Sequence, residues 1–328
     1  MSLLLILICS GSICHLEARM RSLSLVRVDR LSKRYSRAKA LENASFTVER
    51  GVTGLIGPNG AGKSTFIKIV LGLIRPTEGE ANIFGLNSRK ERNKIMERVG
   101  VLHEKPSLPS WVTAKQYLEY VASLKRLSNV AEEIERVSEI CSLSGYIDRR
   151  IGTFSAGMAQ RLGLAGALIG KPELVILDEP TANLDPLGRY DVLAKIKRLR
   201  DETEMNFLIS THILSELEKV CDNIVILNEG KVLTYGSLTE LALKYSSRKY
   251  FVRVDKPKVF VAGLTEETRR RVKVKGDGIL VEIDAEEELL KELNEELRSQ
   301  TFTLKEFRLL TPTLEDIFIE AMRRKQID

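Results

Sequence analysis

The strongest constraint in the sequence is a glycine-rich loop between an apolar run and a predicted helix. Residues 57–65 fit the pattern G-x-x-x-x-G-K-[ST] and follow the apolar residues 52–56. A loop of this kind turns its backbone N–H groups toward phosphate oxygens, and the positive end of the next helix faces the same anion. The lysine of the pattern pairs with the β and γ phosphates, and the hydroxyl after it binds Mg²⁺. The residues of this predicted phosphate cradle are Gly57, Pro58, Asn59, Gly60, Ala61, Gly62, Lys63, Ser64 and Thr65.

A second part of a nucleotide site is expected where an apolar strand ends in two carboxylates. Residues 174–177 are apolar, and Asp178 and Glu179 follow them. Ligands of parallel sheets bind at the carboxyl ends of strands. We therefore expect Asp178 to hold Mg²⁺ and Glu179 to polarise the attacking water as general base. Taken alone, the segment also fits a buried strand that runs into a solvated acidic turn.

Length and composition restrict the class of protein. The chain has 328 residues, of which 43% are hydrophobic and 29% charged, as in globular proteins with room for one large and one smaller domain. The net charge of +6 is diffuse and does not distinguish an anionic membrane face from nucleic acid. The four cysteines lack the spacing of a zinc or redox site, so we expect a reducing cytosol.

The first 20 residues stand apart from the rest. Their apolar run, residues 3–9, is shorter than the roughly 20 residues that span a bilayer. No positive residue precedes it, as one would in a signal peptide. Because Met20 directly precedes the folded pattern, we expect residues 1–20 to be a disordered extension or a wrongly assigned start.

Two domains are predicted from the order of the elements. Strand and helix patterns alternate from residue 25 onward, which predicts an α/β fold with a mainly parallel sheet. A helical stretch over 113–142 interrupts this alternation as an inserted subdomain. After a polar boundary near 244–249, a strand at 250–254, a hairpin at 272–283, a helix at 285–297 and a strand at 302–308 predict a small α+β domain, of β-α-β-β-α-β type. The expected domains are 21–244 and 245–328.

Three further motifs narrow the family. Residues 154–161 read FSAGMAQR, residues 183–185 read NLD, and residues 210–212 read STH. In order and spacing they resemble the signature motif, the D-loop and the switch histidine of ATP-binding cassette (ABC) proteins, and the resemblance covers residues 21 to about 244. It implies a P-loop NTPase with an antiparallel β subdomain, and an ATP-hydrolysing subunit of a transporter.

The resemblance also implies that two such subunits meet head to tail. Ser155 and Gly157 of one subunit then cap the ATP on the cradle of the other, and Asp185 mediates contact between the two sites. His212 contacts the γ phosphate, and adenine stacks on Tyr35, because stacking needs only a flat π face. Each residue also has an ordinary structural interpretation: a helix cap for Ser155, a satisfied histidine for His212, and a tyrosine at the edge of the core for Tyr35.

The sequence departs from the family pattern at two positions. Ala156 replaces the first of the paired glycines of the signature, which adds a methyl group where backbone and phosphate approach closely. Glu104 stands where the family's glutamine loop has glutamine. Glutamate still offers an oxygen ligand, so we expect Glu104 to lie near both nucleotide and Mg²⁺.

The C-terminal motif suggests which transporters the chain serves. Residues 313–318, TLEDIF, resemble the closing helix of drug, antibiotic, polysaccharide or lipid exporter ATPases, although a helix capped by Thr313 would read the same way. We expect a cytoplasmic ATPase on the inner face of the cell membrane, paired with a second ATP-binding subunit, most simply a copy of itself. It is expected to grip an integral-membrane permease beside residues 104–120, and no nucleic acid is expected as partner.

Two other functions remain open at this stage. A cassette ATPase that acts on the ribosome or on nucleic acid would use basic residues, and residues 269–271 form an arginine cluster. A solvated helix face explains the same cluster. A regulatory module that does not hydrolyse ATP is disfavoured by the intact Glu179. The transported substrate is not visible in the sequence.

Overall fold

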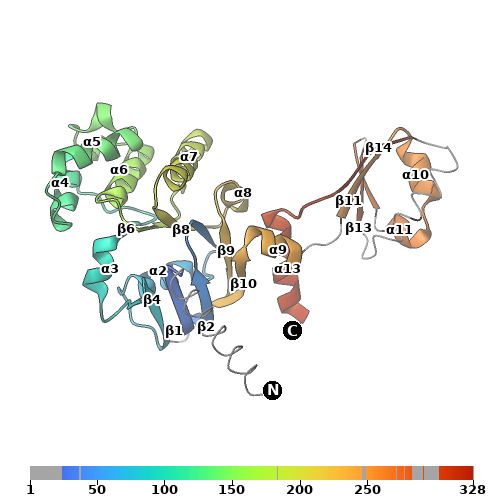
Figure 1. Cartoon of the computed structure of the whole chain (residues 1–328), viewed down its shortest axis with the longest axis horizontal. Helices are drawn as coiled ribbons and strands as arrows, with labels where there is room; N and C mark the ends of the chain where they lie inside the picture. The colour runs from blue at the N-terminus through green and yellow to red at the C-terminus, as the bar shows by residue number, and fades with distance from the viewer. Residues whose placement is uncertain are drawn as a thin grey trace, which may run out of the picture. The chain divides into compact units, whose positions relative to one another are not determined.

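The computed structural model describes residues 24–36, 38–182, 184–245, 249–270, 272–276, 278–282, 291 and 303–327. Their contacts divide the chain into two compact units, Met1–Leu238 and Thr239–Asp328 (Figure 1). This division lies at the start of helix α9 (Leu238–Lys244), whereas the boundary expected from the sequence, at 244–245, lies at the end of this helix. The N-terminal extension and most of the helix expected at 285–297 lie outside the described residues.

A six-stranded sheet forms the centre of the first unit. Its strands, in spatial order, are β10 (Lys231–Ser237), β9 (Asn223–Asn228), β3 (Val52–Ile56), β8 (Asn206–Thr211), β7 (Leu174–Asp178) and β6 (Val99–Leu102). All neighbours run parallel except the β9–β10 hairpin. Every residue of β3, β7 and β8 is buried, as expected for parallel strands covered on both faces. The prediction of a mostly parallel sheet is confirmed.

An antiparallel sheet supplies the other wall of this core. Its strands, in order, are β2 (Ala38–Val48), β1 (Val26–Tyr35), β4 (Glu78–Ile83) and β5 (Leu86–Asn87). Helix α2 (Lys63–Val70) contributes to one core cluster with both sheets, and its Phe66 packs 5.0 Å from Phe46, measured between ring centroids. Because the core holds α2 on several sides, the cradle that precedes this helix is fixed in place.

The helical insertion is also confirmed. Helices α4 (Ala114–Leu124), α5 (Val130–Ile140) and α6 (Ala156–Leu168) gather together as the green and yellow-green helices of Figure 1. Helix α4 begins with a capping box in which Thr113 and Gln116 satisfy each other's backbone N–H groups. The first unit also contains α3 (Arg92–Arg98), α7 (Pro186–Glu202) and the short α8 (Leu214–Leu217).

The second unit contains a four-stranded antiparallel sheet in the order β12 (Val272–Lys275), β13 (Gly278–Glu282), β11 (Lys249–Val254) and β14 (Leu304–Leu309). Helices α10 (Pro257–Gly263) and α11 (Glu266–Arg270) follow β11, and α13 (Leu314–Ile327) ends the chain. Its core is formed by residues such as Tyr250, Val252, Phe260 and Ile279. No helix in the described part of the chain has the length and apolar character needed to cross a bilayer.

The arginine cluster has a structural use inside this unit. Arg269 donates hydrogen bonds to the carbonyl oxygens of Val261, Ala262 and Leu264 at the end of α10. Arg270 forms an ion pair of 2.8 Å with Glu266. Arginines that satisfy the last carbonyls of a helix are expected in any folded domain. These contacts favour the structural interpretation of the two arginines.

Candidate nucleotide-binding and hydrolysis site

The sheet brings three motifs to one edge. Ile56, the last residue of β3, pairs in parallel with Thr211 of β8, and Ser210 of β8 pairs with Asp178 of β7. Parallel neighbours end at the same edge of a sheet, so the segments that follow all three strands emerge together. The cradle follows β3, His212 follows β8 and Glu179 follows β7.

The cradle places its lysine against the acidic residues. Gly62 caps α2 with φ 107°, and a Cβ there would lie 2.4 Å from the carbonyl oxygen of Ala40. Glycine is therefore required at this turn. The Nζ atom of Lys63 donates hydrogen bonds to the carbonyl oxygens of Gly57, at 2.6 Å, and Pro58, at 3.3 Å. The same nitrogen lies 3.6 Å from Oε1 of Glu179.

The two carboxylates are held by β8. The hydroxyl of Ser210 donates a hydrogen bond to Oδ1 of Asp178 and accepts one of 3.1 Å from the backbone N–H of Glu179. Glu179 has φ 49°, the left-handed conformation that side chains other than glycine rarely adopt. Its Oε2 atom lies 3.0 Å from Nδ1 of His212. Glu179 thus contacts the cradle lysine with one oxygen and the switch histidine with the other.

A pocket of about 530 Å³ joins most of the predicted nucleotide residues. Tyr35 stands at its wall with 45% of its surface exposed, so a ring face is available for stacking. Glu104 lines the same pocket. The complete lining is Tyr35, Ala38, Lys39, Ala40, Pro58, Asn59, Gly60, Ala61, Gly62, Lys63, Ser64, Thr65, Glu104, Glu179, Ala182 and His212.

Five predicted residues do not line this pocket: Gly57, Asp178, Ser155, Gly157 and Asp185. Ser155 caps α6, and its hydroxyl accepts a 3.3 Å hydrogen bond from the N–H of Met158. Asp185 caps α7 by accepting a 2.7 Å bond from the N–H of Gly188. Gly57 and Asp178 lie next in sequence to lining residues, whereas Ser155 and Asp185 act within this chain as helix caps.

Several supporting residues were not predicted from the sequence. Gln160 is buried within the signature motif and donates a 2.9 Å hydrogen bond to the carbonyl oxygen of Pro180, next to Glu179. Lys39 lines the pocket and pairs with Glu42 at 2.8 Å. Ser210 belongs to the STH motif, residues 210–212, but that motif predicts a role only for its histidine. The spacing of these residues along the chain carries no signal for their contacts.

The oxygen-rich donor set suits Mg²⁺. The hydroxyl of Ser64 is exposed and makes no hydrogen bond within the described structure, and the carboxylates of Asp178 and Glu104 are the other predicted ligands. Mg²⁺ prefers hydroxyl, carboxylate and phosphate oxygens. The described residues contain no group of three histidine, cysteine or acidic side chains that could hold a metal ion by themselves.

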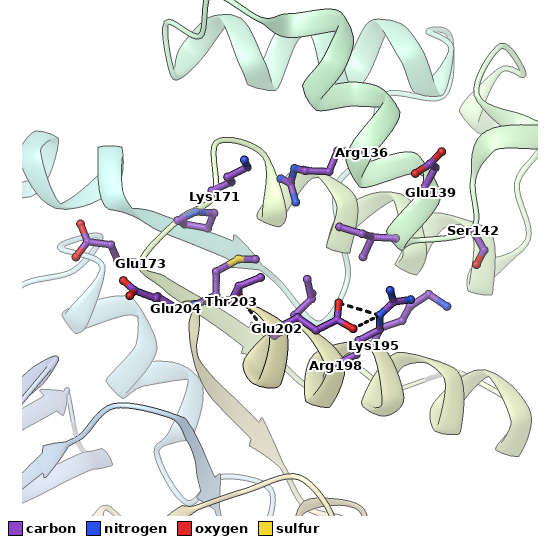
Figure 2. Close-up of a pocket in the computed structure, with 14 residues that line it drawn as sticks. Arg136, Glu139, Ser142, Lys171, Glu173, Lys195, Arg198, Glu202, Thr203 and Glu204 are labelled. Carbon is purple, nitrogen blue, oxygen red and sulfur yellow. Dashed lines mark hydrogen bonds and ion pairs between the residues drawn. The ribbon is translucent and has the colours of Figure 1, made fainter.

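A larger cavity, of ≈ 720 Å³, lies between α5, α7 and the segment before β7 (Figure 2). It shares no lining residue with the nucleotide pocket. Arg198 and Glu202, which are one turn apart on α7, form an ion pair of 2.8 Å, and Arg136 is bound to Glu133. Because these charges neutralise one another and no nucleophile stands beside a base, the nucleotide pocket remains the candidate site.

Comparisons with known proteins show which family the chain belongs to. A family model described as ABC transporter matches residues 41–182, and one for the C-terminal domain of DrrA1-3-like ATP-binding proteins matches residues 236–322. The chain is 39% identical over 228 residues to the bacitracin transport ATP-binding protein BcrA of Bacillus licheniformis, covering 69% of this chain and 74% of that protein. It is 37% identical over 233 residues to the ABC transporter ATP-binding protein YxlF of Bacillus subtilis (strain 168), covering 70% and 77%.

A solved structure of the ATP-binding subunit of an ABC transporter is 32% identical, with a TM-score of 0.62 over 68% of this chain and 93% of the other. These relatives are ATP-binding proteins of ABC transporters, and nothing among them favours a ribosomal or nucleic-acid role. The chain belongs to the ATP-binding proteins of ABC transporters and is an ATP-hydrolysing subunit coupled to transport.

Proposed function

We propose that this subunit hydrolyses ATP in the pocket between the cradle and Glu179, and that the cycle drives export through a separate membrane permease. The observation that carries the proposal is the 3.6 Å approach of Lys63 Nζ to Glu179 Oε1. Two motifs more than a hundred residues apart in sequence thereby face one site. A cradle and a base that share one γ phosphate need this proximity.

Each residue has a role in this proposal. The cradle N–H groups and Lys63 bind the phosphates, and the ring of Tyr35 stacks on adenine. Lys63 must then exchange its contact with Glu179 for one with phosphate, which frees that carboxylate to accept a proton from the attacking water. His212, hydrogen-bonded to Glu179, orients this carboxylate.

Ser64 and Asp178 would hold Mg²⁺, with Glu104 beside them, and the cation would neutralise charge on the β and γ phosphates. The bond from Ser210 fixes one oxygen of Asp178. Residues that orient a metal ligand in this way typically affect affinity by 10- to 100-fold.

The partners are part of the proposal. A second copy would supply Ser155 and Gly157 to the ATP on this chain, where the exposed hydroxyl and N–H groups of a helix start suit a phosphate. Trp111 and Tyr120, which are 76% and 62% exposed, stand in the region expected to grip the permease. Large exposed aromatic side chains are typical of binding surfaces.

The location and cargo class follow from the partners. A subunit that binds a permease works at the inner face of the membrane, where ATP is present. The similarity to a bacitracin transport protein favours an antibiotic or a related amphiphile as cargo. A permease that co-purifies with the tagged chain would support this assignment, whereas ribosomal RNA in its place would contradict it.

The decisive experiment is Glu179→Gln in the full-length chain. The amide cannot accept the proton from water, so steady-state phosphate release should fall by roughly 10²- to 10⁴-fold. ATP binding should stay within about twofold, because the cradle is intact. ATP should then hold the variant as a dimer, measured by analytical ultracentrifugation.

Glu97→Gln provides the matched control, since Glu97 is an exposed carboxylate on α3. It should behave as the unchanged protein in all three measurements. Undiminished turnover in Glu179→Gln would refute the assignment of the general base.

A further inference from the structure

The acidic residue Glu216 occupies a junction that none of the motifs explains. It lies on α8, four residues after His212, and its side chain is only 13% exposed. Its Oε2 atom accepts a 2.7 Å hydrogen bond from the hydroxyl of Thr181. Its Oε1 atom lies 3.5 Å from Nη1 of Arg189 on α7.

Thr181 belongs to a compact segment that we call the acidic turn, which comprises residues 179–182 with 184 and 185. The N–H of Ala182 donates to the carbonyl oxygen of Glu179 at 3.1 Å, and the N–H of Leu184 donates to that of Thr181 at 3.3 Å. This turn begins with the proposed general base and ends with Asp185, the residue proposed to meet the second subunit.

The acidic turn is attached at two points to the histidine segment, residues 212–217. The first attachment is the 3.0 Å contact between Glu179 and His212, and the second is the 2.7 Å bond between Thr181 and Glu216. One contact alone permits the two segments to rotate about it, whereas two contacts fix their mutual orientation. The second is a charge-assisted hydrogen bond to a mostly buried carboxylate, the stronger kind.

Arg189 connects the same junction to the far end of the turn. Its Nε atom donates a 3.0 Å hydrogen bond to the carbonyl oxygen of Leu184, the residue before Asp185. A displacement of Leu184 therefore moves the guanidinium group that faces Glu216. Besides the direct contact between Glu179 and His212, a second path from the expected subunit contact to the histidine segment therefore runs through the carboxylate of Glu216.

We propose that Glu216 is a positioning residue that couples the subunit contact at residues 184–185 to the alignment of Glu179 and His212. This inference rests on the proposed function, because it assumes that Glu179 is the base and that a partner meets the turn. Glu216 does not touch the nucleotide pocket. It acts through Thr181 and Arg189, so its removal should impair turnover and leave binding of ATP intact.

The test compares Glu216→Ala, Glu216→Gln and Thr181→Val in the full-length chain. We expect Glu216→Ala to lower kcat by about tenfold, the loss of one charge-assisted hydrogen bond, with KM and the affinity for ATP within about twofold. Glu216→Gln retains an oxygen that accepts from Thr181, so it should recover most of the rate. Glu97→Ala, which removes an exposed carboxylate on α3, should leave the rate unchanged.

The double variant Thr181→Val/Glu216→Ala separates positioning from simple loss of stability. If the two residues act as one link, the double variant turns over no more slowly than Glu216→Ala alone. Independent, multiplying losses would overturn the inference, as would parallel losses in kcat and ATP affinity. If Glu216→Ala keeps its kcat while Glu179→Gln is inactive, this inference is rejected and the proposed function stands. If the unchanged protein does not hydrolyse ATP, both the inference and the proposed function are rejected.

Discussion

The ring of Tyr35 provides a test at the scale of a single residue. It lines the nucleotide pocket and is 45% exposed, with Nζ of Lys33 5.0 Å from its centroid. Loss of an aromatic platform costs roughly 1–3 kcal/mol per stacked base. Tyr35→Ala should therefore weaken ATP binding by about 5- to 100-fold in a fluorescence titration.

Tyr35→Phe keeps the flat ring and is the matched control. It should bind ATP as the unchanged chain does. Equal affinity in Tyr35→Ala would show that adenine lies elsewhere, and the structural interpretation of this tyrosine would then stand.

Residues of the site differ in how far the sequence could predict them. The cradle and Asp178-Glu179 were predicted because each motif is local and its chemistry requires particular neighbours. The bonds from Ser210 to Asp178 and from Thr181 to Glu216 join residues 32 and 35 positions apart. Serine, threonine and glutamate at such separations have no distinctive pattern, so only the folded structure reveals these contacts.

Asp185 illustrates how a helix cap and a subunit contact can occupy one position. Its carboxylate caps α7 through the N–H of Gly188. Asn caps about as well as Asp, whereas Ala costs about 1 kcal/mol. We expect Asp185→Asn to keep the thermal midpoint and Asp185→Ala to lower it by a few degrees, about 2–4 °C in a protein of this size.

Hydrolysis provides the second measurement on the same pair. If the charge of Asp185 serves the contact between sites, both variants should hydrolyse ATP more slowly. Full activity in Asp185→Asn would show that the role of Asp185 is limited to capping α7.

The attachment of α5 to the end of α6 predicts a pH dependence at the scale of elements. Glu133 is buried and accepts bonds from Arg136 and from the N–H of Gly170, at 2.7 Å. Burial favours the neutral acid, but the bonds from Arg136 and Gly170 outweigh it and lower the pKa of Glu133 below its ordinary value of 4.5. A lowered pKa stabilises the fold at higher pH, and this stability is lost as the pH falls from about 4.5 through the pKa in the folded state.

Glu133→Gln removes this titration. The variant should be less stable at neutral pH, by about 1–3 kcal/mol, because Arg136 loses a charged acceptor. Its unfolding free energy should also decline less on acidification below about pH 5, measured by urea unfolding at several pH values. Parallel declines in the variant and the unchanged chain would contradict this account.

Elements with a clear period were easier to predict than short, irregular ones. The helical insertion follows from apolar spacing and the capping threonine, Thr113. Strands β4 and β5 were not predicted, because the first three residues of β4 are exposed and include Gly79, and β5 has two residues. Strand β4 pairs with β1, and β5 pairs with β4; the first of these pairings is a tertiary contact that local alternation does not encode.

At the scale of the whole molecule, shared sites predict complementation between inactive variants. Lys63→Met disables a cradle, and Gly157→Asp places a negative charge where the partner's γ phosphate is expected. In a mixed dimer, the intact cradle of one subunit meets the intact signature of the other. An equal mixture should recover about one quarter of the unchanged activity, since random pairing makes about half the dimers mixed and each has one working site.

Phosphate release after mixing and re-equilibration in ATP measures this recovery. Each variant alone should remain inactive. A control mixture of the Lys63→Met variant with the double variant Gly157→Asp/Glu179→Gln should also remain inactive, because the only intact cradle then lacks its general base. Recovery that fails in the first mixture while both variants are folded would exclude sites shared between two subunits.

The backbone of Glu179 has a consequence for how this protein can change over generations. Glycine and asparagine easily adopt its φ of 49°, whereas for other residues this conformation costs roughly 1 kcal/mol or more of folding free energy. Substitutions that relax this turn would therefore raise the population of folded chains while they remove the reacting carboxylate. Selection for a stable fold and selection for ATP turnover therefore act in opposite directions at residue 179.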